Sequence, residues 1–163
     1  MPGFSRLWIY QANRKFTGSD KILLEQGLRN LCDQWSAHGN PLETSYYIQY
    51  DQFILLAVNE RLAGASGCSI DGSVRLLKKM QQEAGLDFFD RGKVAFLVDD
   101  EVVLHPLADM EKLFRTQVLS ETTTTFDNTI ATQAEWENHW KIPVKKTWLA
   151  RYLPKATVGD SAA

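Results

Sequence analysis

Apolar residues recur every three or four positions in two stretches of the chain, which predicts two amphipathic helices. The first helix spans about residues 19–36 and the second spans about residues 71–84. Pro106 fits the first turn of a third helix over about residues 107–119, because proline costs no hydrogen bond at that position.

Short runs of apolar and β-branched residues between these helices predict strands. They cover residues 7–10, 44–50, 53–58, 62–66, 93–98 and 101–104. The run Phe53–Val58 is the longest apolar stretch. It fits a buried strand and is far shorter than the roughly twenty residues that cross a bilayer. We therefore expect no membrane-spanning segment.

The order of these elements is strand, helix, three strands, helix, hairpin and helix. It predicts an α+β fold with a single mixed or antiparallel sheet of about five to six strands and helices packed mainly on one face. A length of 163 residues suits one domain. We expect this domain to cover residues 1–155 and a flexible C-terminal tail to cover residues 156–163.

Composition and charge limit which partners and which cellular compartment we expect for this protein. The formal net charge is −2 and like charges form no long block, so we expect neither nucleic acid nor a membrane surface as a partner. Cys32 and Cys68 have no zinc-site spacing and form no disulfide framework. The N-terminus lacks the pattern of a signal peptide. We expect a cytoplasmic protein without a metal or a cofactor.

The segment before the second helix gathers small, polar and thiol side chains. A helix N-terminus exposes backbone N–H groups, which favour negative charge. If successive strands and helices alternate in direction, the link over residues 11–18 lies at the same end of the sheet and brings a cation to this helix start. The candidate ligand-binding residues are therefore Arg14, Ser66, Cys68, Ser69 and Asp71. A small anion such as phosphate or a carboxylate is the expected ligand.

Two other interpretations of this segment compete with the anion site. Small residues suit a tight strand-to-helix turn, in which Ser69 or Asp71 would only cap the helix. Cys68 is also a weak catalytic candidate, because a helix N-terminus lowers a thiol pKa. A cysteine nucleophile needs a base within hydrogen-bond reach, and the expected layout places His38 and His105 at the other end of the sheet. The sequence therefore offers no complete catalytic constellation.

The aromatic residues late in the chain suggest a third function. Thr132 and Glu135 have capping-box spacing ahead of a short helix that ends near Trp140. Three tryptophans lie in the region from Trp136 to Tyr152. An exposed aromatic patch there would serve as a surface for a protein partner or a homodimer.

Several stretches make the chain resemble a small uncharacterised bacterial family of about this length. The stretches are Trp8–Tyr10 with Arg14, Trp35–Gly39, Ala65–Asp71 and Phe88–Arg91. The resemblance covers most of residues 6–152 and implies no biochemical role. Members of such families often carry the automatic label "ABC transporter ATPase".

The sequence contradicts that label. Such an ATPase needs the pattern G-x-x-x-x-G-K-[ST], in which backbone N–H groups and a lysine hold the phosphates. The only Gly-Lys pair is Gly92-Lys93, which is followed by Val94, and Asp87 stands in place of the first glycine. The leading hypothesis is instead a cytoplasmic accessory domain that binds a small anion without catalytic chemistry. The alternatives are an enzyme with Cys68 as a reactive thiol and an interaction module over Trp136–Tyr152.

Overall fold

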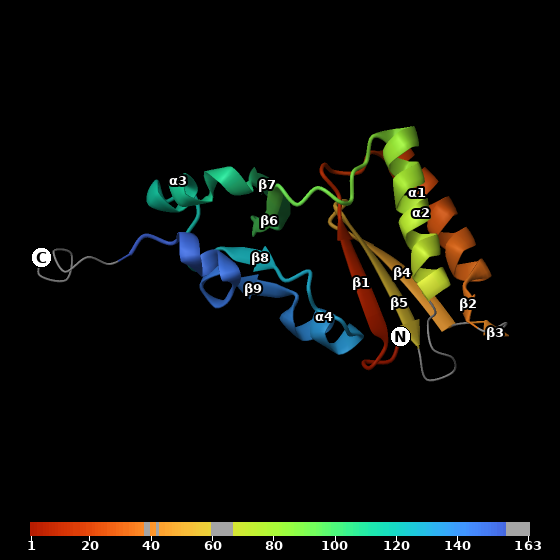
Figure 1. Ribbon diagram of the computed structural model, residues 1–163. Coiled ribbons are helices and arrows are strands. Elements are labelled where there is room, and N and C mark those ends of the chain that lie inside the picture. Colours follow the sequence, from red (N-terminus) through yellow and green to blue (C-terminus); the bar gives the residue numbers. More distant parts are fainter. Residues whose placement is uncertain (38–39, 42, 60–66, 156–163) are drawn as a thin grey trace, which may run out of the picture. The chain divides into compact units, whose positions relative to one another are not determined.

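The computed structural model describes residues 1–37, 40–41, 43–59 and 67–155, which form two compact units (Figure 1). The first unit combines Met1–Asp90 with Asn128–Trp140, and the second combines Arg91–Asp127 with Lys141–Ala163. The sequence-based expectation of one domain over residues 1–155 stays a prediction. The predicted tail lies outside the described residues.

The first unit is built on a three-stranded antiparallel sheet. Its strands are β1 (Arg6–Gln11), β4 (Glu43–Gln49) and β5 (Phe53–Asn59), in the order β1-β5-β4. Every residue of β5 is buried. A strand that is covered on both faces has no reason to alternate apolar with polar residues, which explains the unbroken run Phe53–Val58.

Two long helices cover one face of this sheet: α1 (Gly18–Gln34) and α2 (Gly67–Ala84) (Figure 1). Their buried residues form one core with alternate residues of β5. This core includes Leu24, Leu28, Ile54, Leu56, Val58, Leu77 and Met80. The helical spacing of the leucines in α1 is therefore the signal of a buried stripe, as predicted.

The short helix α4 (Gln133–His139) packs on the opposite face of the same sheet. Trp136 lies 4.9 Å from the ring of Tyr47, and Trp140 lies 5.0 Å from the ring of Phe53, measured between ring centroids. The predicted capping box is present: the Thr132 hydroxyl accepts from the Glu135 N–H, and Glu135 accepts from the Thr132 N–H. Trp140 is buried, so it belongs to the core and not to an exposed patch.

The second unit contains a four-stranded antiparallel sheet. Its strands are β6 (Lys93–Val98), β7 (Glu101–Pro106), β8 (Thr124–Phe126) and β9 (Lys141–Pro143), in the order β7-β6-β8-β9. Asp99 and Asp100 both have positive φ angles, which suits the tight turn between β6 and β7.

Three helical segments pack beside this sheet. They are the 3₁₀ turn η1 (Leu107–Asp109) with helix α3 (Met110–Arg115), and the 3₁₀ turns η2 (Val144–Lys146) and η3 (Trp148–Tyr152). The core of this unit, to which both the sheet and these segments contribute, contains Phe96, Met110, Phe114, Leu119, Val144 and Leu149. The predicted third helix is shorter than expected, because Gln117 adopts a left-handed conformation just after it.

The α+β class is confirmed, and the expectation of one sheet is corrected. The described strands form separate antiparallel sheets of three and four strands, with a short ladder between β2 (Ser36–Ala37) and β3 (Asn40–Pro41). Local patterns identify strands but not their partners, which depend on long-range pairing. The predicted run over residues 62–66 lies outside the described residues. Within the described ranges, no helix has both the length and the apolar character needed to cross a membrane.

Candidate functional site

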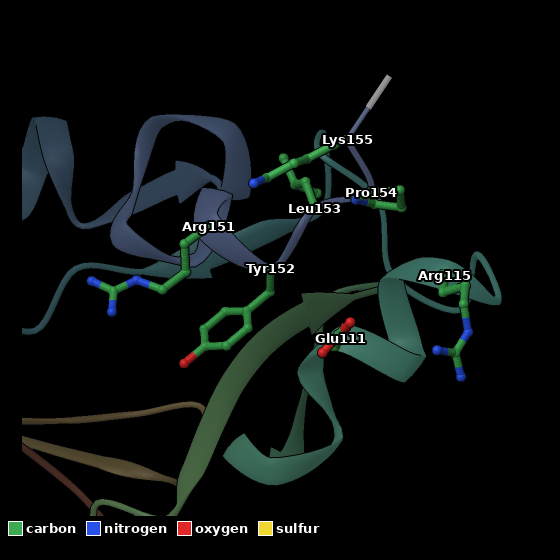
Figure 2. Close-up of a pocket in the computed structure, with 7 residues that line it drawn as sticks. All are labelled: Glu111, Arg115, Arg151, Tyr152, Leu153, Pro154 and Lys155. Atoms are coloured by element: carbon green, nitrogen blue, oxygen red, sulfur yellow. The ribbon is translucent and has the colours of Figure 1, made fainter. Parts of the chain in front are cut away.

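The second unit contains an open pocket of about 450 Å³. Seven residues line it: Glu111, Arg115, Arg151, Tyr152, Leu153, Pro154 and Lys155 (Figure 2). Two of them come from α3, and the other five form the end of η3 and the chain that follows. The pocket therefore joins two segments that lie almost forty positions apart in the sequence.

Local structure explains why these side chains face the pocket. Met110 and Phe114 are buried and anchor α3, which leaves Glu111 and Arg115, one helical turn apart, on an exposed face. Thr147 caps the turn η3, because its hydroxyl accepts from the Leu149 N–H at 3.1 Å. Leu149 is buried, and this fixes the neighbouring Arg151 at the surface.

The pocket is positively charged within a chain that is negative overall. Of the described residues that line it, three are cationic (Arg115, Arg151 and Lys155) and Glu111 alone is acidic. Residues 141–155 contain five cationic residues, including Arg151 and Lys155, and no aspartate or glutamate. Figure 2 shows Arg115 and Arg151 extending in different directions, with the Glu111 carboxylate between Arg115 and Tyr152. The positive charge therefore lies around the rim.

An aromatic pair adjoins the same wall of the pocket. The rings of Trp148 and Tyr152 meet edge to face with their centroids 6.1 Å apart. The guanidinium carbon of Arg151 lies 5.8 Å from the centre of the Trp148 ring, and Arg151 Nε donates to the Trp148 carbonyl at 3.3 Å. Trp148 remains 53% exposed. Arg151 and Tyr152, which line the pocket, are therefore both in contact with the exposed ring of Trp148.

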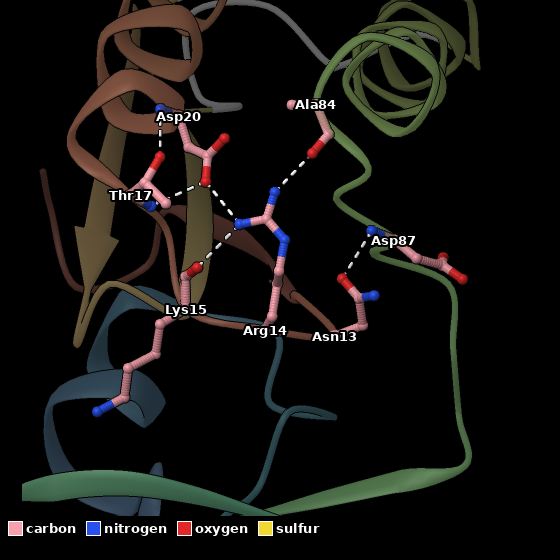
Figure 3. Close-up of polar contacts among 7 residues, drawn as sticks. All are labelled: Asn13, Arg14, Lys15, Thr17, Asp20, Ala84 and Asp87. Atoms are coloured by element: carbon pink, nitrogen blue, oxygen red, sulfur yellow. Dashed lines mark hydrogen bonds and ion pairs between the residues drawn. The ribbon is translucent and has the colours of Figure 1, made fainter.

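Arg14, the cation of the sequence-predicted site, is occupied by structural contacts in the first unit (Figure 3). Its Nη1 donates to Asp20 Oδ2 at 2.6 Å and to the Lys15 carbonyl at 3.1 Å, while Nη2 donates to the Ala84 carbonyl. Asp20 also accepts from the Thr17 N–H at the start of α1. Arg14 therefore connects the N-terminus of α1 with the C-terminus of α2.

These contacts correct the expected layout of the two helices. Arg14 lies at the last residue of α2, and the helix starts at Gly67, about 25 Å away along its axis at 1.5 Å per residue. A Cβ atom placed on Gly72 would lie 3.6 Å from Leu31, so the start of α2 lies beside the end of α1. The helices run antiparallel, and Arg14 does not meet the start of α2.

The remaining predicted residues fall in or just before α2. Cys68 and Ser69 lie in its first turn, and Asp71 follows them inside the helix with an exposed side chain. Neither Ser69 nor Asp71 is the residue that precedes the helix, so the expectation that one of them caps it is wrong. Ser66 lies outside the described residues.

The other cysteine has the properties of a structural thiol. Cys32 is half-buried in α1, and burial raises the pKa of its thiol. A higher thiol pKa leaves less thiolate at neutral pH. Among the histidines, His105 packs against Phe96 in the second unit, and His38 lies outside the described residues. In the part of the chain that the structure describes, no group of three or more His, Cys, Asp or Glu residues is placed to hold a metal ion.

Comparisons with protein-family models, curated proteins and solved structures found no match for this chain.

The sequence analysis did not predict this pocket: Arg151 and Tyr152 fall in the region proposed as an interaction surface, and none of the lining residues was a ligand-binding candidate. One signal was available: the run from Lys141 to Lys155 contains cations and aromatic residues but no carboxylate. The contribution of α3 could not be found in this way, because it depends on how two distant segments pack.

Proposed function

We propose that the protein is an accessory domain that binds a small anionic ligand in the pocket between α3 and η3. The observation that carries this proposal is the surplus of cations in the pocket wall: Arg115, Arg151 and Lys155 against Glu111. Guanidinium groups bind phosphate and carboxylate through paired, charge-assisted hydrogen bonds. The role is one of binding, and no chemical step is assigned to the lining residues.

The dimensions of the pocket support a small ligand. A volume of about 450 Å³ lies within the range of roughly 300–1,000 Å³ that is usual for small-molecule sites. Leu153 and Pro154 add an apolar wall beside the charged groups. Arg115 is exposed on a flexible side chain, so an anion would draw its guanidinium inward and order it.

The start of α2 remains a second candidate for the anion. A helix start favours negative charge through its backbone N–H groups, but Arg14 makes its contacts at the other end of α2 and cannot assist them. The proposal for the pocket is therefore the stronger one, because the pocket supplies full positive charges. The two candidate sites lie in different units and can be distinguished by residue-specific measurements.

A titration with inorganic phosphate and pyrophosphate, followed by ¹H–¹⁵N NMR, tests the proposal. We expect the largest shifts in α3 and η3, and about ten-fold weaker binding in Arg115→Gln, which loses a charge-assisted hydrogen bond. Lys112→Gln is the matched control, because it removes one charge from an exposed position of the same helix outside the pocket wall. Shifts confined to the start of α2, or equal losses in both variants, would contradict the proposal.

An interaction role is favoured by one observation, the exposure of Trp148. Trp136 and Trp140 pack within the first unit, so Trp148 is what remains of the predicted Trp136–Tyr152 surface. Light scattering tests this second function. A homodimer that dissociates in Trp148→Ala would favour it, and a wild-type monomer would count against self-association.

A further inference from the structure

We infer that the anionic ligand is a phosphate ester that carries a planar ring, such as a nucleoside monophosphate. This inference rests on the proposed function and adds the class of ligand. It is carried by the aromatic residues beside the cations, and not by the cations alone. A pocket for inorganic phosphate would need only the charged groups.

The aromatic surface is continuous with the charged one. Tyr152 lines the pocket, and its ring meets that of Trp148, which is more than half exposed. Arg151 belongs to both surfaces, because it lines the pocket and lies over the Trp148 ring. A ligand whose phosphate contacts Arg151 would therefore bring its remaining atoms against Tyr152 or Trp148.

A planar ring is the group that such a surface recognises best. Aromatic side chains stack on nucleobases, and a guanidinium plane can stack on a ring while its N–H groups contact phosphate. The absence of carboxylates from residues 141–155 leaves nothing on this segment to repel the phosphate. Glu111, on α3, is the acidic group among the described residues of the pocket wall, and its carboxylate could accept a hydrogen bond from a ligand hydroxyl group.

Three probes separate this inference from the proposal on which it rests: AMP, ribose 5-phosphate and adenosine. Calorimetric titrations of the full chain should show AMP binding at least about five-fold more tightly than ribose 5-phosphate, which has the phosphate but no ring. AMP should also bind about ten-fold more tightly than adenosine, which lacks the phosphate. In NMR spectra, AMP but not ribose 5-phosphate should shift the Trp148 indole resonance, assigned with Trp148→Phe.

A pair of variants locates the ring. Tyr152→Leu should reduce the preference for AMP over ribose 5-phosphate, whereas Tyr152→Phe keeps the aromatic face and should retain the preference. Tyr152 also packs against the core of the second unit, so Tyr152→Leu could fail to fold. In that case the comparison of AMP with ribose 5-phosphate on the wild-type chain tests the inference by itself.

The outcomes that overturn each statement differ. Equal affinity for AMP and ribose 5-phosphate overturns the inference and leaves the anion proposal standing. If adenosine binds as tightly as AMP, the phosphate contributes nothing to affinity, and the inference of a phosphate ester is overturned. If none of the three probes binds, and inorganic phosphate and pyrophosphate do not bind either, the proposed function fails and the inference fails with it.

Discussion

Arg14 connects the N-terminus of α1 with the C-terminus of α2 through hydrogen bonds of its guanidinium group. Its side chain is 39% exposed, while that of its partner Asp20 is nearly buried. Hydrogen bonds to charged groups contribute about 1.5–3 kcal/mol, and partial exposure reduces this, so Arg14→Ala should lower the free energy of unfolding by about 1–2 kcal/mol. Urea unfolding measures the loss. Lys15→Ala is the control, since it keeps the carbonyl that Arg14 contacts; an equal loss there would contradict the assignment.

The same ion pair should make stability depend on pH. The hydrogen bond from Arg14 holds the pKa of Asp20 below its ordinary value of 3.8, and the bonds from Thr17 add to this effect. A depressed pKa means that the stabilisation is present above the unfolded-state pKa and is lost as the pH falls through the folded-state pKa. The stability difference between wild type and Asp20→Asn should therefore be constant above about pH 5 and should shrink as the pH falls below the ordinary pKa of 3.8. A difference that stays constant over this range would show that Asp20 contributes through its shape alone.

Glu111 opposes the charge of the pocket that it lines. Removing a negative charge beside a bound anion should raise the affinity of the pocket for that anion. The interaction free energy of an exposed charge pair is about 0.2–1 kcal/mol. Glu111→Gln should therefore bind pyrophosphate up to about five-fold more tightly, with the gain reduced at high salt. Glu121→Gln, an exposed acidic position outside the pocket wall, provides the comparison. Weaker binding in Glu111→Gln would mean that the carboxylate itself holds the ligand.

The thiol of Cys32 should react slowly in the folded chain. Burial raises the pKa of Cys32, so its alkylation at pH 7.5 should be slower than that of a free thiol and should accelerate when the chain unfolds. Iodoacetamide labelling followed by mass spectrometry measures both sites, and Cys68→Ser isolates the signal of Cys32. Fast labelling of Cys68 alone would keep the enzyme alternative open. If both thiols react only on unfolding, the alternative of a reactive Cys68 should be abandoned.

At the scale of the elements, local signals were sufficient for most predictions. The capping box at Thr132 and Glu135 identified the start of α4, and the leucine spacing identified α1, because both depend on residues within one or two turns. The second helix was placed four residues too late: it starts at Gly67, and the small residues assigned to a turn lie inside it. Small and polar residues are permitted in a helix when tertiary contacts stabilise it.

The candidate site was harder to predict, because it depends on the direction of each element. The expected layout, which counted elements one by one, gave α2 the direction opposite to the observed one and brought its start to Arg14. In the structure β5 runs away from the end of the sheet that holds Gln11, and α2 returns toward it. In such a count the direction of each element depends on all the elements before it, so a single error exchanges the two ends of the sheet for every element that follows. The charged pocket could not be predicted for a related reason, since α3 and η3 come together only through packing.

At the scale of the whole molecule, the two units are interleaved in the sequence. The chain passes from the first unit to the second after Asp90, returns after Asp127, and leaves again after Trp140. The last crossing follows α4, which covers one face of the first sheet, and leads into β9, an edge strand of the second sheet. Neither unit is therefore contained in one continuous segment, and each needs residues from the final quarter of the chain.

A truncation after Asp127 should consequently destabilise both units together. It removes Trp140 from Phe53 in the first unit, and it removes Val144 and Leu149 from the core of the second. Losing a large buried side chain costs about 3–5 kcal/mol, which is comparable to the whole stability of about 5–15 kcal/mol of a typical domain. Thermal unfolding and NMR signal dispersion measure the effect in fragment 1–127. Fragment 1–155, which keeps every described residue, is the control and should unfold like the full chain. Native dispersion of the β1 and β5 signals in fragment 1–127 would show that α1 and α2 alone stabilise the first sheet, and that α4 is an addition to a unit that is already complete.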